Sequence, residues 1–151
     1  MRKLILMFLF LISGAVHAAD TATQNFDGSC GTVTFRVSMI YTDTPGVRKY
    51  VVSAVRANGS TQRLYTGEEG GRFQGACLTS KKGVPLFVFR TYCRTGNCAN
   101  QKYGAIEATK DLEMVLRPRP GNIANDKALA GLLGGPVTDL GLTSKFFCCR
   151  D

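Results

Sequence analysis

Six cysteines carry the clearest chemistry in this sequence. They are Cys30, Cys77, Cys93, Cys98, Cys148 and Cys149. In an oxidising compartment, their even number favours disulfide bonds over free thiols. The tetrapeptide between Cys93 and Cys98, Arg-Thr-Gly-Asn, is typical of a turn, so we predict a bond across the mouth of a hairpin. The same spacing could begin a zinc site, but oxidising conditions disfavour thiolate ligands.

The remaining cysteines give a second expectation. Cys148 and Cys149 are neighbours, and in a strand their side chains would point to opposite faces. We therefore expect each of them to bind a different partner. Cys30 and Cys77 remain as those partners, and the sequence leaves open which bonds to which.

Catalytic chemistry finds little support. The only histidine, His17, lies in an N-terminal segment that we expect to be removed, which excludes Ser-His-Asp and Cys-His catalysis and the usual zinc sites. A serine-lysine hydrolase could use Lys81 or Lys82, but no serine lies in a G-x-S-x-G motif. Paired carboxylates of the glycosidase type could come from Glu68, Glu69, Glu107, Asp111 and Glu113, although their spacing singles out no pair. We expect no enzyme, no metal and no cofactor.

The N-terminal segment has the layout of a secretory signal peptide. Arg2 and Lys3 precede an apolar run, and Val16-His17-Ala18 offers small residues at a cleavage site. Because the run is shorter than the ~20 residues that span a bilayer, we expect cleavage rather than anchoring. The sequence thus predicts a signal peptide at 1–18 and a single β-rich domain at 19–151. That domain would be periplasmic or secreted, with no transmembrane segment.

Hydrophobic alternation and turn residues predict about seven strands. Their ranges are 32–41, 47–57, 61–66, 72–78, 84–93, 103–108 and 112–117. The run at 84–93 is the most apolar and reads as a central strand. Asn58-Gly59 predicts a tight hairpin, a reading we prefer to the N-glycosylation pattern that Asn58-Gly59-Ser60 also fits. Residues 67–71, Gly-Glu-Glu-Gly-Gly, predict a loop without regular structure.

One short helix should follow the strands. Asn125 or Asp126 can cap its start, and Gly134-Gly135-Pro136 can end it. Apolar residues recur at helical spacing between them, and Leu112, Met114 and Leu116 should share one face of the last strand. The expected fold is mainly β: a disulfide-bonded antiparallel β-sandwich or small barrel with one short C-terminal helix.

Net charge bears on the choice of partner. Removing Arg2 and Lys3 would lower the formal charge from +8 to +6, an excess that favours anionic partners or serves only solubility. Arg90, Tyr92, Arg94, Lys102 and Tyr103 could form a basic aromatic face. Nucleic acid is still an unlikely ligand for an exported protein.

These features favour a non-enzymatic exported binding protein, an inhibitor or immunity protein that blocks a hydrolase or toxin. Periplasmic lysozyme inhibitors are similar in build, but their Ser-Gly-x-x-Tyr loop is absent. The alternatives are a binding module for an anionic envelope ligand, such as lipopolysaccharide or an acidic glycan, and a small carboxylate-based hydrolase. The candidate partner-binding residues are Glu68, Glu69, Arg72, Lys81, Lys82, Arg94, Lys102, Arg117 and Arg119.

Overall fold

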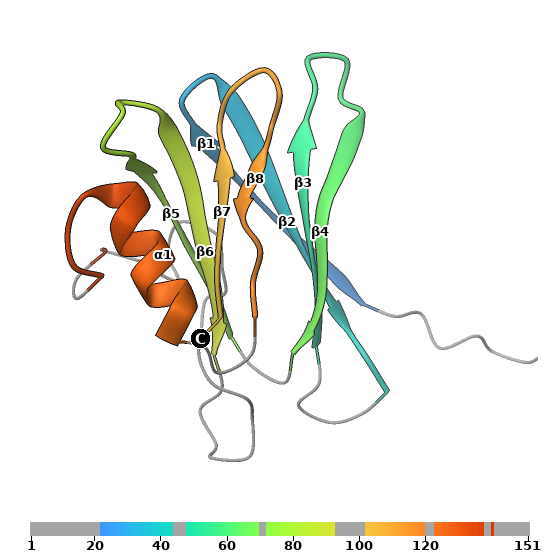
Figure 1. Ribbon diagram of the computed structural model, residues 1–151. Helices are drawn as coiled ribbons and strands as arrows, with labels where there is room; N and C mark the ends of the chain where they lie inside the picture. The colour runs from blue at the N-terminus through green and yellow to red at the C-terminus, as the bar shows by residue number, and fades with distance from the viewer. Residues whose placement is uncertain are drawn as a thin grey trace, which may run out of the picture.

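The computed structural model describes residues 22–43, 48–69, 72–92, 102–119, 123–137 and 140. Within these ranges the chain forms eight strands and one helix (Figure 1). The elements are β1 (Thr23–Cys30), β2 (Val33–Tyr41), β3 (Arg48–Val55), β4 (Thr61–Glu69), β5 (Arg72–Thr79), β6 (Pro85–Tyr92), β7 (Lys102–Glu107), β8 (Met114–Leu116) and α1 (Ile123–Leu133).

The strands form two antiparallel sheets of four, each in sequence order. The N-terminal sheet is β1-β2-β3-β4 and the C-terminal sheet is β5-β6-β7-β8, and Figure 1 shows them stacked face to face. The predicted mainly β, disulfide-bonded sandwich with one helix is confirmed. The strand count is eight rather than seven, because β1 is largely polar and exposed and gives no apolar alternation.

Aromatic rings fill the space between the sheets. Phe35 stacks on Phe87 with ring centroids 4.6 Å apart, and Tyr50 lies 5.5 Å from Phe73. All four side chains are fully buried. Since these pairs join the two sheets, they are the main apolar contact that fixes one sheet on the other.

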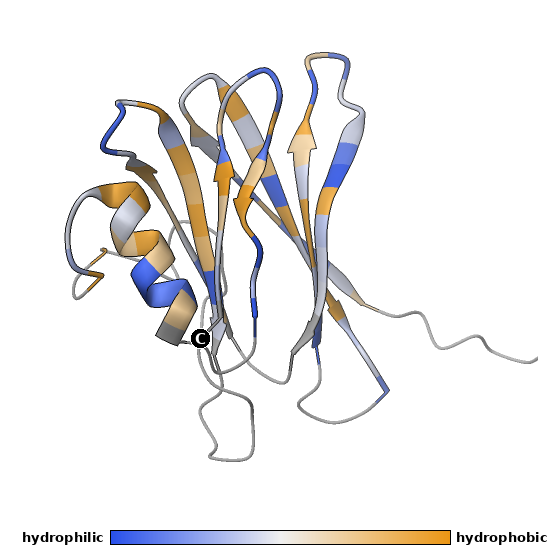
Figure 2. Ribbon diagram, in the orientation of Figure 1, coloured by the Kyte–Doolittle hydropathy of each residue, from blue (hydrophilic) through white to orange (hydrophobic). Residues whose placement is uncertain are grey.

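A second core lies on the other face of the C-terminal sheet. Leu86 and Val88 of β6 point there and are fully buried with Leu129 of α1. Their neighbours Phe87 and Phe89 point into the first core. Because β6 is buried on both faces, its sequence is continuously apolar rather than alternating, as Figure 2 shows. This explains why the central strand was the easiest element to predict.

The disulfide pattern corrects one expectation. Cys30, at the end of β1, is bonded to Cys77 of β5, with their Cα atoms 5.1 Å apart. Cys148 and Cys149 therefore do not use these two residues as partners, and that prediction was wrong. The elimination argument failed because stacking of the sheets brings two residues 47 positions apart together. The predicted bond between Cys93 and Cys98, and both C-terminal cysteines, lie outside the described residues.

Residues 67–69 were expected in a loop but extend β4. In the ladder, Lys49 lies opposite Glu68 and Arg48 lies opposite Glu69. Backbone pairing with β3 thus continues through residues of low strand propensity.

Two expectations near the C-terminus were also wrong. A register shift between β7 and β8 places Met114 beside the core between the sheets and Leu116 in the core under the helix, so they do not share a face. Asn125 does not cap α1 but lies inside its first turn. The predicted end of the helix is confirmed: Gly134 adopts a φ of 78° and its N–H donates to the Ala130 carbonyl at 2.8 Å.

The turn at Asn58 is confirmed, although it is longer than a two-residue hairpin. The Arg56 N–H donates to the Ser60 carbonyl at 2.8 Å, and Gly59 has a φ of 80°. The side-chain oxygen of Asn58 accepts hydrogen bonds from the Ser60 amide and hydroxyl. The asparagine thus stabilises the turn through its own side chain.

Candidate functional site: a cationic cleft beside β4

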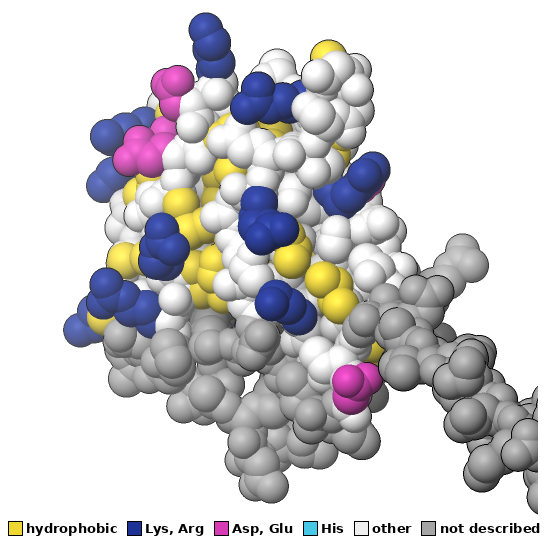
Figure 3. Space-filling model, turned by 90° about the vertical axis from the view of Figure 1, so that its right-hand side faces the viewer, with side chains coloured by type: hydrophobic (Ala, Val, Ile, Leu, Met, Phe, Trp, Pro, Cys, Tyr) yellow, Lys and Arg dark blue, Asp and Glu magenta, His cyan; other side chains and the backbone are white. Residues whose placement is uncertain are grey.

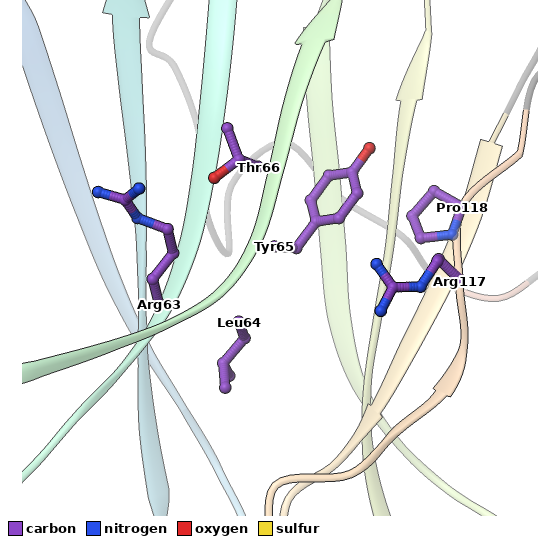
Figure 4. A pocket seen from close by; sticks show the side chains of 6 residues that line it. All are labelled: Arg63, Leu64, Tyr65, Thr66, Arg117 and Pro118. Atoms are coloured by element: carbon purple, nitrogen blue, oxygen red, sulfur yellow. The ribbon is translucent and has the colours of Figure 1, made fainter.

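A cleft of about 300 Å³ opens between the two sheets on the side of β4 and β8. One wall consists of four consecutive residues of β4, and the other of two residues that follow β8. The lining residues are Arg63, Leu64, Tyr65, Thr66, Arg117 and Pro118, shown in Figure 4. We call this feature the β4 cleft.

The cleft exists because the two edge strands differ in length. In the described part of the chain, β4 and β8 each have a strand neighbour on one side only. β4 runs for nine residues, whereas β8 has three and gives way to Arg117-Pro118. Proline cannot donate a hydrogen bond to a ladder, which helps to explain why the edge ends there. The longer strand is left with the cleft beside it.

A β-bulge determines which face of β4 each side chain occupies. Val52 pairs with Tyr65 while Ser53 pairs with Arg63, so Leu64 is an extra residue in β4. Figure 4 shows Tyr65 directed toward the wall after β8, and Arg63 directed to the other side of the strand. The cleft therefore has one guanidinium on the outer face of the N-terminal sheet and a second, from Arg117, facing Tyr65.

Two glycines make room for the rings and the proline at the cleft. The Tyr65 ring lies 5.3 Å from Phe89, between their centroids. A methyl group added at Gly67 would come within 2.5 Å of the Tyr65 hydroxyl oxygen. One added at Gly104 would lie 2.8 Å from Pro118 Cγ and would also collide with the Phe89 ring. Both positions thus require a residue without a side chain.

The wall after β8 is anchored from the helix. The side-chain amide of Asn125, 5% exposed, donates to the carbonyl of Tyr103 at 2.9 Å and to that of Arg117 at 3.0 Å. It therefore ties α1, β7 and the chain after β8 together. Arg117 has a fixed backbone and an exposed side chain, an arrangement that presents a charge at low entropic cost.

Among the described residues that line the cleft, the charged ones are Arg63 and Arg117, and both are positive. Both are exposed. Figure 3 shows further Lys and Arg side chains spread over the side that carries the N-terminal sheet, with hydrophobic patches between them. An arginine fork binds a carboxylate or a phosphate through two parallel hydrogen bonds. The lining chemistry therefore suits an anionic group.

One ion pair on the N-terminal sheet shows how an arginine there binds a carboxylate. Arg36 donates from Nε and one terminal nitrogen to the two oxygens of Asp27, both at 2.7 Å. The hydrogen bond from Arg36 holds the pKa of Asp27 below its usual value, and Asp27 raises the pKa of Arg36. This pair lies on β1 and β2 and is separate from the cleft.

The structure divides the predicted partner-binding residues among several places. Arg117 lines the cleft, and Arg119 is exposed two residues further on. Lys81 and Lys82 lie in the turn after β5, where the Lys81 N–H donates to the Leu132 carbonyl at the end of α1.

The other predicted residues lie at strand ends in both sheets or outside the described residues. Glu68 and Glu69 end β4, Arg72 begins β5 and Lys102 begins β7, and only their backbones are described. Arg94 lies outside the described residues.

Sequence reasoning missed Arg63, although its strand was predicted. Alternation along 61–66 is a signal that Arg63 faces solvent, but only the stacking of the sheets places it near Arg117. Of the carboxylates considered for a hydrolase, Glu107, Asp111 and Glu113 lie in or around the β7–β8 hairpin and do not line the cleft.

Of the basic aromatic face considered for nucleic acid, Arg90 and Tyr103 have described side chains, and these contact each other on the C-terminal sheet. Arg90 donates to the side-chain oxygen of Gln74 at 2.8 Å and to the Tyr103 hydroxyl at 3.1 Å. Its guanidinium lies 5.8 Å from the ring centre of Tyr103, which is 5% exposed. Bases could not stack on a ring that is covered in this way.

No protein-family model matches this sequence, no curated protein matches it, and no solved structure matches its fold. Among the described residues, His, Cys, Asp and Glu side chains nowhere gather in a group that could hold a metal ion. In the same residues, no helix has the length and apolar character needed to cross a membrane.

Proposed function

We propose that this chain is a non-enzymatic, exported binding protein that recognises an acidic element of another protein through the β4 cleft. The observation that supports this most strongly is that Arg63 and Arg117 both line the cleft and that no acid is found among its described lining residues. In this proposal the protein acts as an inhibitor or immunity protein, blocking a hydrolase or toxin by occupying a surface that its partner needs.

The charge of the cleft narrows the class of partner. A positive cleft repels a basic protein and attracts an acidic one, which also speeds association at low salt. Glycoside hydrolases carry paired carboxylates at their active sites, so an acidic hydrolase is a partner of matching charge.

Rigidity supports binding rather than catalysis as the role of this scaffold. The sheets are cross-linked by Cys30–Cys77, and the Arg117 wall is anchored by Asn125. Groups held in place before binding lose little conformational freedom in the complex, so more of each contact remains as affinity.

Capture from an envelope extract tests the proposal. The immobilised protein should retain a protein partner, and the Arg63→Glu/Arg117→Glu variant should not. A matched control, Lys110→Glu/Lys127→Glu, changes the net charge equally at two exposed residues outside the cleft and should capture as the wild type does. Equal capture by all three proteins would contradict the proposal.

A second candidate function is binding of an anionic glycan or lipid in the same cleft. The observation that favours it is the apolar surface of Leu64 and Pro118 and the ring of Tyr65 beside the two guanidinium groups, since a sugar acid offers both a flat face and a carboxylate. Retention on lipopolysaccharide or heparin that the cleft variant loses, with no protein captured, would establish this function instead.

A further inference from the structure

We propose that the occupant of the β4 cleft is an extended acidic segment of the partner, which pairs with β4 as a fifth strand of the N-terminal sheet. This inference rests on the proposed function and names the way in which the partner binds. It rests on three observations: the edge of β4 that carries no strand among the described residues, the direction of the two arginines, and the charge of the cleft.

The edge of β4 is long enough to accept a strand. Among the described residues, β4 pairs with β3 and has no strand on its other side. The cleft lies along four consecutive residues, 63–66, which at ~3.3 Å per residue is about 13 Å of strand. Exposed edges of this kind bind peptides through main-chain hydrogen bonds, while the side chains give specificity.

The two arginines lie on opposite sides of the strand that would be added. Arg63 is on the outer face of the N-terminal sheet, and Arg117 approaches from the side of the C-terminal sheet (Figure 4). Successive side chains of a strand point to opposite faces. Two acids at an odd spacing, such as neighbours, would therefore each meet one arginine, whereas acids two residues apart would both lie on one face.

The charge distribution favours another chain over a second copy of this one. The sequence is strongly basic, with a net charge of +8, and its only neighbouring acids are Glu68 and Glu69. These already lie opposite Lys49 and Arg48 in the β3–β4 ladder. The bulge at Leu64 also interrupts the edge, a device that hinders pairing between identical edges.

Two peptides of equal composition and charge distinguish strand pairing with β4 from non-specific electrostatic attraction. Fluorescently labelled TVTEEVTV carries its acids at neighbouring positions, and TVETEVTV carries them two residues apart. We expect TVTEEVTV to bind the full-length protein at least about tenfold more tightly, a difference of about 1.4 kcal/mol, measured by fluorescence polarisation. Equal affinities, or no binding of either peptide, would overturn the inference.

Backbone methylation tests the hydrogen bonds directly. TVTEEVTV is prepared with N-methyl groups on alternate residues in two versions, each of which blocks one edge of the peptide. Only one edge pairs with β4, so one version should lose binding and the other keep it. Equal loss in both versions, or in neither, would contradict pairing with β4.

A charge exchange provides a control that does not depend on loss of folding. The Arg63→Glu/Arg117→Glu variant should bind TVTKKVTV and not TVTEEVTV. A wild-type dimer in sedimentation that TVTEEVTV fails to dissociate would show that a second copy occupies the edge, and would overturn the inference. The proposed function fails separately, if the variant still captures the partner from the extract.

Discussion

Removing the Cys30–Cys77 bond should lower stability substantially without changing the fold. The bond joins residues 47 positions apart. For a closed loop of that size, the loss of chain entropy in the unfolded state corresponds to about 4 kcal/mol at 25 °C. Measured disulfides usually stabilise by about 2–4 kcal/mol, so we expect the Cys30→Ala/Cys77→Ala variant to lose an amount in that range.

Urea denaturation of the oxidised proteins measures this loss. The slope of the free energy of unfolding against urea is compared as well, because opening a cross-link exposes more of the unfolded chain. A peptide map of the unreduced wild type serves as the control for pairing. A loss below about 1 kcal/mol, or a map in which Cys30 is bonded to Cys148 or Cys149, would refute the reasoning.

Three further predictions concern the cleft and the surface of the sandwich. Gly104→Ala should cost about 1–3 kcal/mol in urea denaturation, because the added methyl collides with a buried ring, whereas Gly131→Ala, in an open helical position, should cost nothing. Asn125→Ala leaves two carbonyl groups without their donor and should cost about 1–3 kcal/mol; its affinity for TVTEEVTV should also fall, and unchanged affinity would show that the anchor does not position the cleft. Because Arg36 lowers the pKa of Asp27, the pair stabilises the fold above the carboxyl's unfolded pKa of about 3.9 and ceases to do so as the pH falls through the lower folded value. The stability difference between wild type and Asp27→Asn should therefore shrink as the pH is lowered from 7 toward 2, and a constant difference would argue against the ion pair.

Local sequence signals predicted the elements whose side chains are most deeply buried. The run at 84–93 is apolar on both faces because β6 lies between two cores, and no other element type suits so short an apolar run with β-branched and aromatic residues. Gly134 ends the helix through its own backbone geometry, so its role could be predicted from composition alone. Both features depend on neighbours in sequence.

Features that depend on the stacking of the sheets could not be predicted. β1 is exposed along one edge and is held by pairing with β2, which no apolar alternation reveals. The partner of Cys30 is fixed by the position of β5, and elimination from the spacing of other cysteines gave the wrong answer. Arg63 and Arg117 are 54 positions apart in sequence, and they line the same cleft only because β4 and β8 are edge strands on the same side of the sandwich.

The affinity of the captured partner for three proteins tests the central claim most directly. Titration calorimetry would compare the wild type, Arg63→Glu/Arg117→Glu and Lys110→Glu/Lys127→Glu. Reversing two charges that become desolvated in a complex costs about 2 kcal/mol or more for each, so the cleft variant should bind at least about a thousandfold more weakly, and the control within about threefold of the wild type. Equal weakening of both variants would show that only net charge matters, and would contradict a binding site at the β4 cleft.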